Sequence, residues 1–98
     1  DVVARECVMQ LTGQKIDPAT FADEHVKPMA DATCHDIAMR GVPHSFVAPT
    51  WSRPDAKMIA EHTASAGATG PVIRAVVYEA VDGTQVLSLL YSARFAAV

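Results

Sequence analysis

The hydrophobic residues near the start of the chain recur at intervals of three and four positions. They are Val3, Cys7, Val8 and Leu11. This spacing is typical of one face of an α-helix. Gly13 follows, and glycine is common directly after a helix end. We therefore predict a first helix over residues 2–12.

A second helix is predicted over residues 17–40, where the signals at both ends agree. Asp17 can cap the N-terminus, and Pro18 suits the first turn, where a backbone N–H has no helical partner. Gly41 follows the last turn. Pro28 lies inside the span, lacks a backbone donor and clashes with the preceding turn, so we expect it to kink or split this helix.

A third helix is predicted from the capping box Ser52-x-x-Asp55 to about residue 66. Its apolar stripe consists of Ala56, Ile59, Ala60 and Thr63. Residues 42–51 connect it to the second helix and hold two prolines. Residues 45–48 of this connector are a candidate short strand.

The last third of the chain has a composition typical of β-strands, rich in Val, Ile, Tyr and Leu. Asp82-Gly83 is a strong signal for a two-residue hairpin turn, which predicts strands over residues 72–81 and 84–95. The expected fold is α+β in a single domain, residues 1–98. Three helices would pack on this C-terminal antiparallel hairpin, which residues 45–48 could extend to a three-stranded sheet.

A two-residue turn would place Tyr78 opposite Leu87 and so assign each strand residue to a face. One face, which includes both of these residues, is expected to pack on the helices. The other face is also apolar, and we predict it as an interface formed by Ile73, Val77, Val81, Val86 and Leu90. Each large apolar side chain left in water would forgo about 1.5–3 kcal/mol. Either a protein partner or second copy covers this face, or the first helix does so within the subunit.

The charge balance argues against nucleic acid as a partner. The 98 residues carry a net charge of −3, without the basic footprint that phosphate binding requires. Seven of the eleven acidic residues lie within residues 1–36, which predicts an acidic helical face able to dock on a basic target. No apolar run reaches the roughly 18 residues of a membrane span.

The sequence contains no motif for a catalytic, metal or cofactor site, so we predict none of these. The four histidines are scattered, and only Asp31 and His35 share a helical spacing suited to a surface pair. Cys7 and Cys34 are compatible with either one disulfide or two buried thiols. His44, Phe46 and Trp51 of the connector are candidate ligand or partner contacts.

These observations favour a non-enzymatic protein–protein interaction module, such as a small inhibitor, an immunity protein, an adaptor or a chaperone-like protein. It would act as a homodimer or with a protein partner. One alternative is a winged-helix-like DNA-binding regulator that uses residues 53–66 as its recognition helix. Another is a small subunit of an oligomeric enzyme. The composition suggests a bacterial protein of the cytoplasm or periplasm, and the start at Asp1 suggests a processed or trimmed chain.

Overall fold

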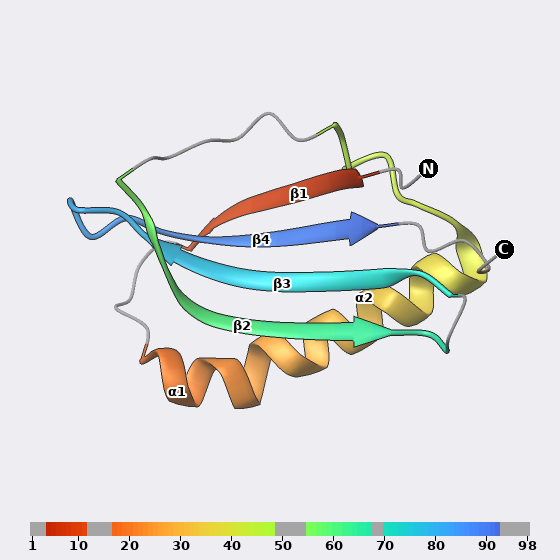
Figure 1. The fold of residues 1–98 in the computed structure, drawn as a ribbon, viewed down its shortest axis with the longest axis horizontal. Helices are drawn as coiled ribbons and strands as arrows, with labels where there is room; N and C mark the ends of the chain where they lie inside the picture. The colour runs from red at the N-terminus through yellow and green to blue at the C-terminus, as the bar shows by residue number, and fades with distance from the viewer. Residues whose placement is uncertain (1–3, 12–16, 49–54, 68–69, 93–98) are drawn as a thin grey trace, which may run out of the picture.

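The computed structural model describes residues 4–11, 17–48, 55–67 and 70–92, which form an antiparallel sheet with one helical run on one face (Figure 1). In chain order the elements are β1 (Ala4–Leu11), α1 (Pro18–Phe21), the π-helical segment η1 (Ala22–Val26), α2 (Lys27–Arg40), β2 (Lys57–Ser65), β3 (Val72–Glu79) and β4 (Gln85–Ser92). The four strands lie in the order β1-β4-β3-β2. The α+β class is confirmed, but the prediction of three helices on a hairpin is wrong.

The segment predicted as the first helix is the edge strand β1. Cys7 and Leu11 fit both a four-residue period and the alternation of a strand, and in the structure they share the helix-side face, whereas Val8 lies on the opposite face. The whole segment pairs with β4 from Ala4↔Ser92 to Leu11↔Gln85. These long-range backbone hydrogen bonds outweigh a short helical pattern, because such a pattern alone cannot separate helix from strand.

The segment predicted as the third helix is the other edge strand, β2, which pairs with β3. Its Ala-rich composition favours a helix only weakly, and tertiary pairing overrides that preference. A β-bulge between Met58 and Ala60 shifts the register, so that strand alternation is hidden in the sequence. The winged-helix hypothesis thereby loses the recognition helix that it required. Of the predicted capping box, only Asp55 lies within the described residues.

The helical run agrees with the helix predicted from Asp17 onward. The Asp17 carboxylate accepts a hydrogen bond from the Ala19 N–H at 3.2 Å, and the run ends at Gly41, whose φ of 86° suits glycine. Pro28 does not split the run into two helices. Instead, the π-helical segment η1 lies directly before α2. The wider turn of η1 accommodates Pro28, which lacks a backbone N–H.

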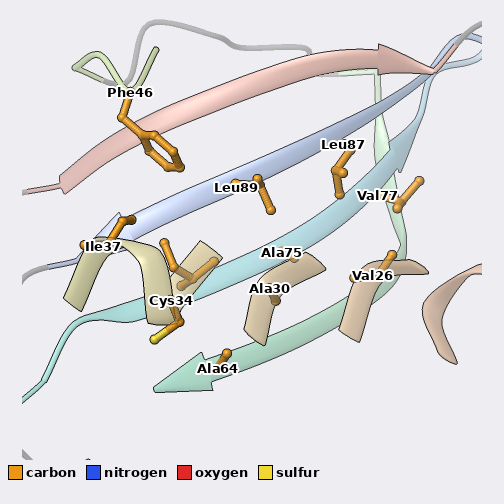
Figure 2. Packing of buried hydrophobic residues seen from close by; sticks show 11 residues of the cluster. Val26, Ala30, Cys34, Ile37, Phe46, Ala64, Ala75, Val77, Leu87 and Leu89 are labelled. Atoms are coloured by element: carbon orange, nitrogen blue, oxygen red, sulfur yellow. The ribbon is translucent and has the colours of Figure 1, made fainter. Parts of the chain in front are cut away.

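The core lies between the helical run and one face of the sheet. The helix contributes four buried residues at intervals of four, four and three positions: Val26, Ala30, Cys34 and Ile37 (Figure 2). The sheet contributes Ala64, Ile73, Ala75, Val77, Leu87 and Leu89. Phe46, from the segment that follows α2, projects toward β1 and β4 and is also buried (Figure 2).

The hairpin turn between β3 and β4 contains three residues, not the predicted two. The Ala80 N–H donates to the Thr84 carbonyl at 2.9 Å, and the Gly83 N–H donates to the Ala80 carbonyl at 2.9 Å. Gly83 has a φ of 88°, so the turn is of type I and is closed by a left-handed glycine. The extra residue moves the register by one position, which places Val77 opposite Leu87.

The shifted register exchanges the faces predicted for β3, because side chains alternate along a strand. Ile73 and Val77, which we predicted on an exposed interface, are 0% exposed and lie in the core beneath the helical run. Val76 and Tyr78, which we expected to contact the helices, lie on the opposite face. The faces predicted for β4 are unchanged, since Leu87 faces the helix and its neighbours alternate accordingly.

Candidate functional site

The sheet face that points away from the helical run is the first candidate surface, and we call it the open face. Its apolar members on the two central strands and β1 are Val8, Val72, Val76, Tyr78, Val86 and Leu90. Within the described residues, no helix lies over this face (Figure 1). An antiparallel sheet with one face in water usually carries polar residues there, so the apolar centre of the open face is unusual.

Polar side chains lie on the edge strands of this face and also between its apolar residues on the central strands, where Arg74 lies opposite Leu90 and Ser88 opposite Val76. On β1, Glu6 accepts a hydrogen bond at 2.8 Å from the hydroxyl of Ser88, which is buried. On the β2 side, Glu61 forms an ion pair with Arg74 of β3. Arg74 and Glu61 thus neutralise each other within the subunit, and the Glu6 carboxylate has a hydrogen-bond partner there. Protein–protein interfaces likewise combine apolar contacts with hydrogen-bonded polar groups.

The open face exposes less apolar surface than the sequence suggested. Val76 is only 2% exposed and Val86 only 8%, so their neighbours already remove them from water. The contactable apolar surface of this face comes from the half-buried Val8, Val72, Tyr78 and Leu90 and from Met58 of β2, which is 50% exposed. Val81, the remaining predicted interface residue, lies outside the face at the hairpin tip and is 86% exposed.

A pocket of about 550 Å³ on the helix side of β1 is the second candidate site, and we call it the Arg5 pocket. Its lining residues are Arg5, Val42, Pro43, His44, Phe46, Val47 and Ala48. Glu6 and Val47 exchange two backbone hydrogen bonds of 2.7 and 3.0 Å, which align the connector beside β1. Because side chains alternate on both segments, Phe46 is brought to the same side of the sheet as Arg5.

Two of the three predicted contact residues, His44 and Phe46, line this pocket, and Trp51 lies outside the described residues. Sequence reasoning missed Arg5, because it placed this residue on a helix. In a strand, Arg5 and Cys7 lie on the same, helix-side face. A cation on that face would have been the sequence signal for the pocket. Apart from their hydrophobicity, nothing in the sequence marks Val42 and Val47 as residues that line a pocket.

Both cysteines are free, but of the two buried thiols predicted as one alternative, only Cys34 is buried and Cys7 is partly exposed. Cys34 lies on α2, is buried, and donates a hydrogen bond from its Sγ to the Pro71 carbonyl at 3.3 Å. Burial raises the pKa of the Cys34 thiol above its ordinary value, and the nearby Asp31 carboxylate adds to this effect. A thiol held protonated in this way is a poor nucleophile.

The structure pairs Asp31 with a histidine other than the one predicted. His62 Nε2 of β2 lies 3.4 Å from the Asp31 carboxylate of α2, so this contact joins the helix to the sheet, whereas the sequence suggested His35. Among the described residues, no three His, Cys, Asp or Glu side chains are grouped so that they could hold a metal ion. Nor does the described part of the chain contain a helix of the length and hydrophobicity needed to cross a membrane.

The raised pKa of Cys34 has a measurable consequence for stability. Above about pH 9, the thiol ionises in the unfolded chain at its ordinary pKa of 9.0 but stays protonated in the folded chain. The free energy of unfolding should therefore fall as the pH rises through this range, by at most about 1.4 kcal/mol per pH unit. Below about pH 8 the thiol is protonated in both states and contributes no slope.

Urea unfolding at pH 8 and pH 10 tests this expectation. Cys34→Ala should lose less stability between the two pH values than the unmodified chain. Val26→Ala truncates another buried helix residue but keeps the thiol, so it should retain the full pH dependence. Equal pH dependence in Cys34→Ala and the unmodified chain would show that this thiol titrates alike in both states.

Comparisons with models of known protein families, with curated proteins and with solved structures found no match to this chain.

Proposed function

We propose that this chain is a non-enzymatic protein–protein interaction module that binds a second copy of itself through the open face. The observation that supports this proposal is the group of apolar residues on the open face, which no helix covers within the described residues. Of its members, Tyr78 and Leu90 are half-buried and lie on the two central strands, where a partner sheet would contact them. Aromatic and large aliphatic side chains at the centre of a patch contribute most to binding energy.

The dimensions of the open face suit a second sheet of the same size. Four strands about 4.8 Å apart, each rising about 3.3 Å per residue over eight or nine residues, cover roughly 500 Å². Two copies packed face to face would bury about 1,000 Å², which is near the lower limit for a specific interface. Two sheets packed in this way form a sandwich with the apolar residues inside.

The charge distribution also permits self-association through this face. Five exposed acidic residues lie along the helical run: Asp17, Asp23, Glu24, Asp31 and Asp36. In a face-to-face dimer these residues would lie on the two outer sides, where like charges stay far apart and are screened by salt. On the open face, Arg74 offsets Glu61, whereas the Glu6 carboxylate keeps its charge while it accepts a hydrogen bond from Ser88.

Sedimentation velocity over a wide concentration range tests the proposal. The unmodified chain should sediment as a dimer of the 10.4 kDa subunit at high concentration. Leu90→Asp should weaken dimerisation at least 10-fold, because it removes an apolar contact and adds a second carboxylate beside Arg74, which lies opposite residue 90 and already pairs with Glu61. Val8→Asp makes the same test from the edge strand β1, with less risk to the core.

Val81→Asp is the matched control, since it changes an exposed valine to the same residue outside the open face. It should leave the dimer intact, and circular dichroism should show that each variant retains its fold. A chain that stays monomeric up to 1 mM would exclude a homodimer as the function of this face. Dimerisation unaffected by both Leu90→Asp and Val8→Asp would place the interface elsewhere.

A further inference from the structure

We infer that the Arg5 pocket binds a small organic carboxylate with an apolar body. This inference is independent of the proposed dimer, because the pocket lies on the helix side of β1 and the open face lies on the other side. The volume of about 550 Å³ falls within the range of about 300–1,000 Å³ that is typical of small-molecule sites.

The residues that line the pocket suit both the carboxylate and the apolar body of such a ligand. Among the described residues that line the pocket, Arg5 and His44 are the only ones with an ionisable side chain, so this part of the lining holds a permanent positive charge and no acidic group. A guanidinium presents a planar fork of donors that matches the two oxygens of a carboxylate. The apolar wall that a ligand body could contact comes from the half-buried Val42 and the exposed Pro43 and Ala48, whereas Phe46 is itself buried.

The Arg5 guanidinium is available for this role. No ion pair within the described part of the chain involves Arg5, whereas Arg74 and Lys27 each contact a carboxylate. The neighbouring acid, Glu6, points to the opposite face of the strand and is bonded to Ser88. In a chain with a net charge of −3, this pocket therefore concentrates positive charge beside apolar surface.

The apolar wall separates this ligand class from simple anions. An inorganic phosphate would use the guanidinium but leave Val42, Pro43 and Ala48 without a partner. A cationic amine of the same length would fit the wall but would be repelled by Arg5. The pocket should accordingly prefer an alkyl carboxylate to the matched alcohol, the matched amine and the bare anion.

Titration of the ¹⁵N-labelled chain with hexanoate, followed by amide chemical shifts, tests this order of preference. Hexanoate should give saturable shifts at Arg5 and within residues 42–48. Hexan-1-ol should bind at least fivefold more weakly, and hexylamine, acetate and phosphate should bind more weakly still. Hexanol binding as tightly as hexanoate would overturn the role of the charge, and acetate binding equally tightly would overturn the role of the wall.

Two matched arginine variants test whether the charge of Arg5 binds the carboxylate. Arg5→Gln should weaken hexanoate at least fivefold and leave the weak binding of hexanol unchanged. Arg40→Gln removes an exposed arginine that is not part of the pocket lining, and it should change hexanoate affinity less than twofold. If Arg5→Gln does not fold, the ligand series on the unmodified chain still tests whether the pocket prefers an alkyl carboxylate. An absence of saturable shifts at the pocket would refute the inference.

Discussion

Val77→Asp is expected to prevent folding at neutral pH. Val77 is 0% exposed and lies between the helical run and the centre of the sheet, beside Leu87. A carboxylate at this position would lose its hydration without gaining a partner, at a cost of about 4 kcal/mol or more. That cost approaches the whole stability of a small domain, which is about 5–15 kcal/mol. Far-ultraviolet circular dichroism and urea unfolding would measure the loss.

Val81→Asp is the control for the same chemical change four residues further along. Because Val81 is 86% exposed at the hairpin tip, this variant should stay within about 0.5 kcal/mol of the unmodified chain. The pair of variants also tests the register of the hairpin. With a two-residue turn, Val77 would have faced away from the helix, so a stable Val77→Asp variant would contradict the three-residue turn.

Gly70→Ala is expected to destabilise the chain by about 3 kcal/mol, because the added methyl group has no space. Gly70 lies in the connection between β2 and β3, and a Cβ there would overlap the carbonyl oxygen of Ala66 and lie 2.7 Å from its carbonyl carbon. The backbone would have to move, which would break the hydrogen bond of 3.1 Å from the Ala66 N–H to the Pro71 carbonyl. Thermal or urea unfolding would detect the change.

Gly67→Ala provides the comparison within the same connection. A Cβ at Gly67 meets no atom within 4 Å, but the φ of 82° disfavours alanine, so the expected cost is only about 1–2 kcal/mol. This variant isolates backbone strain from steric overlap. A Gly70→Ala variant that is as stable as the unmodified chain, or more stable than Gly67→Ala, would show that the connection is not packed as described.

The helix ends and the position of the hairpin could be predicted from the sequence, because local chemistry sets both. Asp17 caps the helical run through its own side chain, and Gly41 ends the run with a left-handed conformation. Asp82-Gly83 likewise marks the hairpin turn, where Gly83 has a positive φ. Each of these signals acts within a few residues, so no knowledge of the rest of the fold is needed to detect it.

The edge strands and the hairpin register could not be predicted in this way. Cys7 and Leu11 are compatible with a helix or a strand, and only pairing with β4 selects the strand. A dipeptide such as Asp82-Gly83 occurs in turns of two or three residues, and the difference moves a side chain from core to surface. The number of residues in the turn therefore decides which face Val77 lies on, and the local sequence does not determine that number.

The candidate sites depend on the tertiary structure even more than the fold does. His44 and Phe46 were suggested by their place in the connector, but the Arg5 pocket exists because β1 lies beside residues 46–48 in the folded chain. The open face likewise arises because the helical run covers one face of the sheet (Figure 1).

By itself, the sequence determined the α+β class, the ends of the helical run and the place of the hairpin, since capping groups and glycines act on adjacent backbone. Only the tertiary structure decided which segments became edge strands, which face of β3 is buried and which residues share a surface. The physical reason is that strand pairing joins backbone groups far apart in the chain, and its energy depends on partners that a local pattern does not identify.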